Sequence, residues 1–206
     1  MFKRTKGYIL LTLLVLTGLA GRLSMDTITT QERRFLIDHL KETRNDLLKS
    51  VKGLSEEQLN FKAAPDRWSI KECVQHITLA EGGLWMMAEG TLKQPANPEK
   101  RSEIKVTDQD LIKMVADRSQ KAQAPETIRP EQASWKTTEE TLDAFKEKRG
   151  ALIKFAKTTT DDMRNHVTTT MLGQIDAYQL LLLLSAHTKR HPLQIEEVKS
   201  NPAFPK

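Results

Sequence analysis

The chain has 206 residues, enough for one domain, and its 38% hydrophobic and 29% charged content is ordinary for a globular protein with its own core. The single cysteine, Cys73, excludes an internal disulfide and a metal site built from cysteines, and it is expected to be a small buried side chain. The net charge of +5 comes mostly from residues 1–24: the remainder has 28 basic and 27 acidic residues, so no basic stripe for nucleic acid is expected.

Residues 1–24 are typical of a secretory signal peptide. Basic residues at positions 3–6 precede an apolar run, Tyr8 to Ala20, whose 13 residues are too few to span a bilayer in the usual way. Small residues, Gly18 and Ala20, stand where a signal peptidase reads, so cleavage after Ala20 and an exported, periplasmic protein are expected. An uncleaved leader would be the contact with a membrane. The alternative is that Met25 is the true start and the protein is cytoplasmic.

Residues 25–206 are predicted to form one all-α domain with four long helices. Each helix is expected to begin at a capping box, in which Ser, Thr or Asp is followed three residues later by Glu or Gln. Apolar residues recur at helical spacing after each box. Strand patterns are nearly absent, and residues 158–175 are predicted to be irregular. A short turn of helix is expected after Ser55, and an extra short helix after Thr107, in the loop between long helices two and three. The four boxes are Thr29/Glu32, Ser69/Glu72, Thr137/Glu140 and Asp176/Gln179.

The last predicted helix carries two histidines, His187 and His191, one turn apart on one face. The run Leu180 to Leu184 precedes them, which indicates a central, buried helix, so the pair is expected to face the interior or a cleft leading into it. Such a pair alone is weak evidence for a metal, because buried histidines often hydrogen-bond carbonyls instead. Thr188 stands where zinc proteases have their glutamate, so their built-in base is absent.

Two segments resemble signatures of the DinB-like superfamily of four-helix bundles. The second-helix signature is similar to Trp68–Ile77, and the last-helix signature is similar to His187–Ile195, in the same order and separation. The resemblance extends from about residue 29 to the end of the chain and implies a metal-binding bundle that is often a homodimer. It also implies a metal site of three histidines plus water. By position these ligands are His76, His187 and His191.

Three neutral imidazoles would leave a bound divalent ion with an open position, which is typical of catalytic sites. Nitrogen ligands suit zinc, nickel, iron or copper and do not choose between them. The resemblance implies a metal-dependent hydrolase that activates water, which is the preferred hypothesis, or a transferase that activates a low-molecular-weight thiol. A non-catalytic metal or small-ligand binding module is a third hypothesis, because no general base stands out. The sequence does not identify the small-molecule substrate.

Several neighbouring residues have simpler interpretations. Trp68 is expected to pack beside the Ser69 cap rather than to bind substrate. His39 and His166 are predicted to be surface histidines. Pro192 removes an amide from the last helix, which predicts a kink beside the ligands. Gln194 flanks the histidine pair and is a candidate for lining a pocket.

Overall fold

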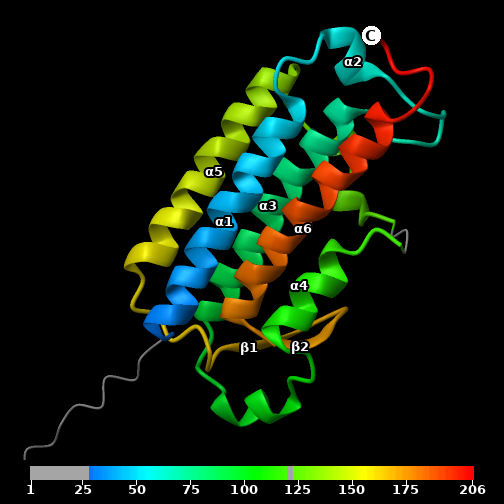
Figure 1. Ribbon diagram of the computed structural model, residues 1–206. Coiled ribbons are helices and arrows are strands. Elements are labelled where there is room, and N and C mark those ends of the chain that lie inside the picture. The colour runs from blue at the N-terminus through cyan, green and yellow to red at the C-terminus, as the bar shows by residue number, and fades with distance from the viewer. Residues whose placement is uncertain (1–27, 120–122) are drawn as a thin grey trace, which may run out of the picture.

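The computed structural model describes residues 28–119 and 123–206, so the predicted leader lies outside the described residues. Four long helices, α1, α3, α5 and α6, form a bundle, with two short helices, α2 and α4, on its outside (Figure 1). Within the described residues, no helix is both long and apolar enough to cross a membrane. The helices are α1 (Thr30–Val51), α2 (Glu56–Asn60), α3 (Ile70–Leu92), α4 (Asp108–Ala116), α5 (Thr138–Thr158) and α6 (Ala177–Lys199).

The predicted capping boxes begin all four long helices. In each box the first side chain accepts a hydrogen bond from the amide three residues later, and the second side chain accepts one from the first residue's amide. At α3, the amide of Glu72 donates to Ser69 Oγ over 3.2 Å, and the amide of Ser69 donates to the Glu72 carboxylate over 2.8 Å. These contacts satisfy amides that have no partner inside the helix.

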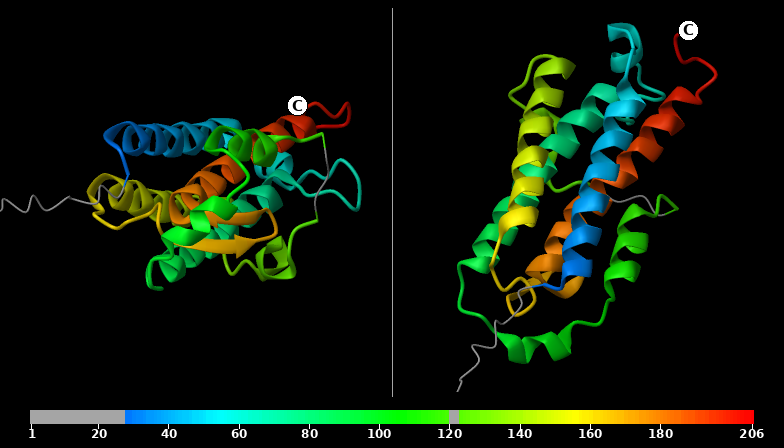
Figure 2. Two further views of the ribbon diagram at one scale, coloured as in Figure 1. Left: turned by 90° about the horizontal axis from the view of Figure 1, so that it is seen from below. Right: turned by 60° about the vertical axis from the view of Figure 1, so that its left-hand side comes forward.

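The four long helices are arranged so that α6 and α5 each pack against both α1 and α3 (Figure 2). The helix α6 also packs against α4, so it is covered on three sides. Most of the leucine run is buried as predicted: Leu180, Leu181 and Leu182 are fully buried, Leu184 is 1% exposed, and Leu183 is partly buried. Burial of these side chains holds α6 at the centre of the molecule.

A two-stranded antiparallel hairpin closes one end of the bundle, formed by β1 (Val167–Thr170) and β2 (Gly173–Asp176). The prediction of an irregular segment here was wrong for these residues. The strands are held by a distant loop, because the Asn97 side chain donates to the Val167 carbonyl over 2.9 Å and accepts from the Val167 amide over 2.8 Å. Gly173 adopts a φ of +93°, which favours glycine at the turn. The last strand residue, Asp176, is also the N-cap of α6, so the hairpin fixes where that helix begins.

The connection between α3 and α5 contains the extra short helix that the sequence predicts, α4, between a 3-10 helix at Pro98–Glu103 and two further 3-10 turns. Those turns are Glu126–Ile128 and Pro130–Gln132. Both 3-10 turns contact α3. Residues 126–132 therefore lie against α3, the helix that carries His76, although they are about 50 residues later in the chain.

The histidine His39 was predicted to lie at the surface, and this prediction was wrong. It is 7% exposed on α1, and its Nδ1 lies 2.7 Å from Ser185 Oγ on α6. His166 is half-buried, with Nδ1 3.2 Å from the Thr91 carbonyl oxygen.

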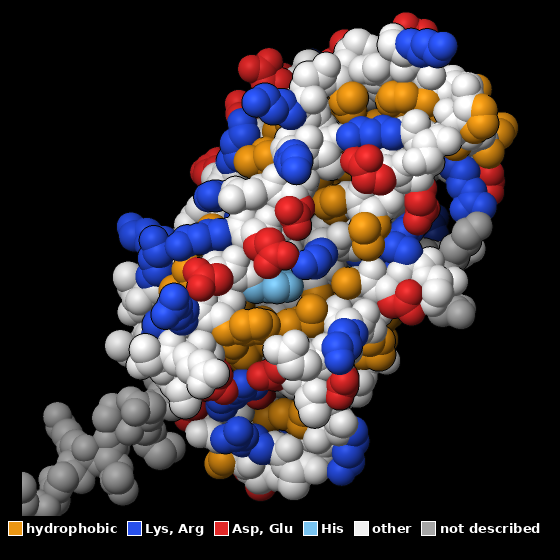
Figure 3. Space-filling model, viewed as in Figure 1, with side chains coloured by type: hydrophobic (Ala, Val, Ile, Leu, Met, Phe, Trp, Pro, Cys, Tyr) orange, Lys and Arg blue, Asp and Glu red, His pale blue; other side chains and the backbone are white. Residues whose placement is uncertain are grey.

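On the face of the molecule seen in Figure 3, basic and acidic side chains are interspersed along the bundle.

Candidate metal centre

The first histidine of the centre, His76, is presented by the second turn of α3, seven residues after the Ser69 N-cap. Its side chain is buried, at 3% exposure. Its Nδ1 lies 2.7 Å from the carbonyl oxygen of Ile128. On another side the Trp68 ring packs against the imidazole, with the ring centroids 4.7 Å apart. Trp68 also packs against the core, so the packing role predicted for it is confirmed, with His76 as one of its contacts.

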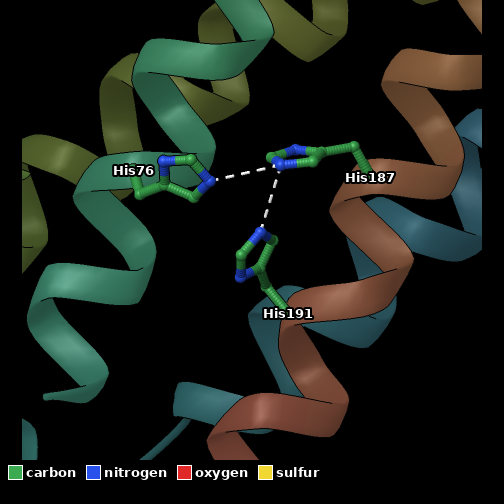
Figure 4. Close-up of side chains that lie close together, drawn as sticks. All are labelled: His76, His187 and His191. Atoms are coloured by element: carbon green, nitrogen blue, oxygen red, sulfur yellow. Dashed lines mark hydrogen bonds between the residues drawn. The ribbon is translucent and has the colours of Figure 1, made fainter. Parts of the chain in front are cut away.

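The other two histidines, His187 and His191, lie one turn apart on α6 and point towards α3 (Figure 4). The Nε2 of His187 lies 3.2 Å from the Nε2 of His76 and 3.2 Å from the Nε2 of His191. The helix α6 is continuous through Pro192, and the kink expected there stays a prediction. Three ring nitrogens from two helices therefore converge on one point, and all the candidate ligand atoms lie within 4.8 Å of one another.

Two of these imidazoles have their protons placed by fixed acceptors. A carbonyl oxygen only accepts, so the contact with Ile128 puts the proton of neutral His76 on Nδ1. Gln194 Oε1 lies 2.9 Å from Nδ1 of His191, and Arg118, which can only donate, donates to the same oxygen over 3.3 Å. That donor makes Gln194 present its oxygen, so His191 also carries its proton on Nδ1. Both rings then direct the Nε2 lone pair at the point of convergence.

His76 and His191 are buried and His187 is half-buried, and this removal from water keeps the three imidazoles neutral. Burial lowers the pKa of His187 to about 3, with the neighbouring His76 and Arg190 adding to the effect. Burial likewise takes the pKa of His191 well below its ordinary value, and His187 and His76 lower it further. The pKa of His76 is lowered by burial although its bond to Ile128 opposes the shift. Neutral imidazole is the form that binds a metal.

The arrangement fits a divalent ion better than it fits hydrogen bonding among the rings. With Nδ1 protonated on His76 and His191, two Nε2 lone pairs face His187 Nε2, which carries at most one proton. At least one pair of ring nitrogens therefore meets without a proton between them, and a shared cation removes that repulsion. Ligands about 2.0–2.1 Å from a tetrahedral ion stand roughly 3.3 Å apart, close to the 3.2 Å found here.

The structure brings together all three predicted ligands, and within the described residues they are the one group of three or more such side chains placed to hold an ion. No aspartate or glutamate belongs to the group. Glu72 acts as the capping partner of Ser69 and pairs with Lys62 at 2.7 Å. Cys73 is fully buried, and burial raises the pKa of its thiol to about 12, as expected of an inert side chain.

The sequence analysis missed one acceptor at the site and a buried ion pair in the bundle. The acceptor for His76 is a backbone carbonyl, which any residue at position 128 would offer, so no sequence signal marks it. Arg149 and Glu81 form a fully buried ion pair. The position of Arg149 in the sequence could have indicated that this residue is buried. Arg149 falls on the buried stripe of α5, in helical register with Thr141, Phe145 and Leu152. A charged residue on such a stripe indicates a buried partner.

Comparison with known proteins places this fold and site in a family. Residues 39–195 match the sequence model of the DinB superfamily, so the chain belongs to that family, as the two signature segments predict. The matched range contains all three histidines.

Two relatives from Bacillus subtilis illustrate the likeness. The chain is 28% identical over 160 residues to the uncharacterized protein YuaE of strain 168, which covers 77% of this chain and 93% of YuaE. The fold is similar to that of YfiT, a four-helix bundle of unusual topology, with a TM-score of 0.59 and 16% identity over 86% of this chain and 91% of YfiT. At that identity the second likeness shows the fold alone, and it confirms the predicted helical bundle.

Proposed function

We propose that this protein is a metal-dependent hydrolase that holds one divalent transition-metal ion, such as zinc, nickel or iron, on His76, His187 and His191. The observation that carries the proposal is the convergence of three Nε2 atoms while Nδ1 of two rings is engaged elsewhere. Three neutral nitrogen ligands leave a position open to substrate or water, as in catalytic zinc sites. YfiT, which shares the fold, is described as a probable metal-dependent hydrolase, and this supports the same class of reaction here.

The roles of the residues follow from their contacts. Ile128 and Gln194 hold the protons of His76 and His191 on Nδ1, so that Nε2 stays available. The Trp68 ring shields one side of His76 from water. When bound, the ion would supply Lewis-acid chemistry, polarising a carbonyl or phosphoryl group and favouring deprotonation of water.

A second candidate function is a metal-binding module without turnover. It is favoured by the composition of the cluster, which contains only histidines among the described residues. A hydrolase commonly uses a carboxylate or another histidine as general base. Among the described residues, no carboxylate that could fill this role belongs to the ligand cluster.

Elemental analysis of the purified protein, followed by a screen of ester, amide and phosphate substrates with and without the metal found, tests the proposal. We expect near-stoichiometric metal and hydrolysis that disappears with a chelator and returns with the ion. His187→Ala should lose both, whereas His166→Ala, which alters a half-buried histidine outside the cluster, should lose neither. Metal without turnover would support the binding module, and turnover only with an added thiol would support a transferase. Equal metal in both variants would contradict the assignment.

A further inference from the structure

The guanidinium of Arg149 lies in the middle of the bundle, fully buried, and all of its hydrogen-bond donors are used. An arginine side chain has five N–H groups. Nε donates to Glu81 Oε1 over 2.5 Å, and Nη2 donates to Glu81 Oε2 and to Thr188 Oγ1, each over 2.7 Å. Nη1 donates to the Leu40 carbonyl over 2.9 Å and to Thr43 Oγ1 over 2.7 Å. One side chain therefore links α5, which carries it, to α1, α3 and α6.

Two of these partners lie on the helices that carry the three histidines. Glu81 follows His76 on α3 by five residues, about 7.5 Å along the helix axis. Thr188 lies between His187 and His191 on α6. The same nitrogen, Nη2, donates to both Glu81 and Thr188, so the two ligand-bearing helices meet at a single atom of a third helix.

We propose that Arg149, with Glu81 and Thr188, is a positioning group for the metal centre: it fixes the sliding and rotation of α6 against α3, and so sets the distance between His76 and the His187–His191 pair. The inference rests on the proposed metal site. Apolar contacts between helices are non-directional and tolerate small shifts of register. Five charge-assisted or directed hydrogen bonds have a fixed geometry and do not. The metal needs its ligand atoms placed to within about 0.5 Å.

The chemistry of the pair favours this interpretation over a role in stability alone. Burying two charges costs desolvation free energy that their attraction only partly offsets, and apolar replacements of similar volume often leave a protein as stable. The Arg149 and Glu81 side chains are 0% and 1% exposed, so the full desolvation cost applies. A gain in stability therefore does not explain why these two charges are buried, whereas a role in positioning the helices does.

Thr188→Val is the sharpest test, because it removes the hydroxyl but keeps the β-branched shape and the Arg149–Glu81 pair. Co²⁺ is titrated into metal-free protein while the visible d–d absorption, which reports ligand geometry, and the melting temperature without metal are recorded. We expect Thr188→Val to bind Co²⁺ about tenfold more weakly with altered absorption. Its melting temperature should also fall, because one buried N–H of Arg149 loses its acceptor, so a control for general destabilisation is needed. Thr188→Ser, which keeps the hydroxyl, should bind like wild type.

A double variant and a matched control complete the experiment. Arg149→Met with Glu81→Met replaces the pair by apolar side chains, so the protein should fold but bind Co²⁺ about 10–100-fold more weakly. Arg164→Met removes another ion-paired arginine, which contacts Glu32, Asp108 and Asp176 near the start of α6. It should lower the melting temperature and leave Co²⁺ affinity and absorption unchanged.

The outcomes are distinguishable. Wild-type affinity and absorption in Thr188→Val and in the double variant would overturn the positioning role. So would an equal loss of affinity in Arg164→Met, because general destabilisation would then explain all three variants. Failure of the wild-type protein to bind Co²⁺ would instead overturn the proposed metal site itself.

Discussion

Nδ1 of His76 lies 2.7 Å from the carbonyl oxygen of Ile128, a residue 52 positions later in the chain. The contact makes a 3-10 turn between α4 and α5 the element that orients the first candidate ligand on α3. Gln194 does the same for His191 from within α6. Two of the three candidate ligands are thus oriented by acceptors that are not ligands themselves.

Replacing any one candidate ligand with alanine should remove most metal binding. Each of His76→Ala, His187→Ala and His191→Ala deletes one of three converging nitrogens. The loss should exceed the roughly 10–100-fold effect of removing an outer hydrogen-bond partner. Isothermal titration with Zn²⁺ measures it, with His166→Ala as the control. His39→Ala is a poor control, because that buried side chain contacts Ser185.

Metal should stabilise the wild-type fold in proportion to the logarithm of its free concentration, because only the assembled site binds it. Saturation at 100 times the dissociation constant should add about 2.7 kcal/mol to the free energy of unfolding. Thermal melts at increasing Zn²⁺ measure this. The melting temperature of His187→Ala should be the same at every Zn²⁺ concentration. If it rises as in wild type, the metal binds elsewhere.

The metal-free protein should lose stability as the pH falls below about 6.5. Burial lowers the pKa of His187 to about 3 in the folded state, while the unfolded chain has the ordinary value near 6.5. Between these values the unfolded state binds the extra proton, so the free energy of unfolding falls with falling pH, by up to about 1.4 kcal/mol per unit for one histidine.

Urea unfolding at pH 7 and pH 5 tests the pH prediction by comparing wild type with His187→Gln. The variant should show a shallower dependence, since glutamine does not titrate. Asp176, whose pKa burial raises to about 6, works in the opposite direction over the lower part of this range, but equally in both proteins. Identical slopes would contradict the prediction, because they would mean that the pKa of His187 is the same in the folded and unfolded states.

Gln194 offers a test of the outer shell without touching a ligand. Gln194→Leu removes the oxygen that holds the His191 proton on Nδ1, so metal affinity should fall about 10–100-fold. Gln194→Glu keeps an oxygen facing both His191 and Arg118, so it should retain affinity. Equal affinities in the two variants would show that the contact does not orient the ring.

Asn97 should matter for stability and not for metal. Asn97→Ala removes both bonds to Val167, leaving a backbone donor and acceptor of β1 without partners, at a cost of about 1–3 kcal/mol. Urea unfolding measures the loss. Gln94→Ala, an exposed change in the same loop, should cost less than about 0.5 kcal/mol. Unchanged Zn²⁺ affinity in both variants is part of the expectation.

The sequence by itself determined the features that depend on neighbours along the chain. A capping box joins residues three apart, so Ser69/Glu72 and Asp176/Gln179 mark helix starts wherever the helices later pack. The spacing of His187 and His191 places both on one face for the same reason. The family signatures added His76, although it lies 111 residues from His187 and no local rule joins them.

Only the tertiary structure decided the contacts that cross the bundle. His39 is buried because Ser185 of α6 packs against it, and the hairpin strand at Val167 is held by Asn97, 70 residues earlier. The bonds from Arg149 to Glu81 and Thr43 span 68 and 106 residues. These contacts depend on how the four helices pack together. A periodic pattern of apolar residues indicates which face of a helix is buried, but it does not indicate which other element covers that face.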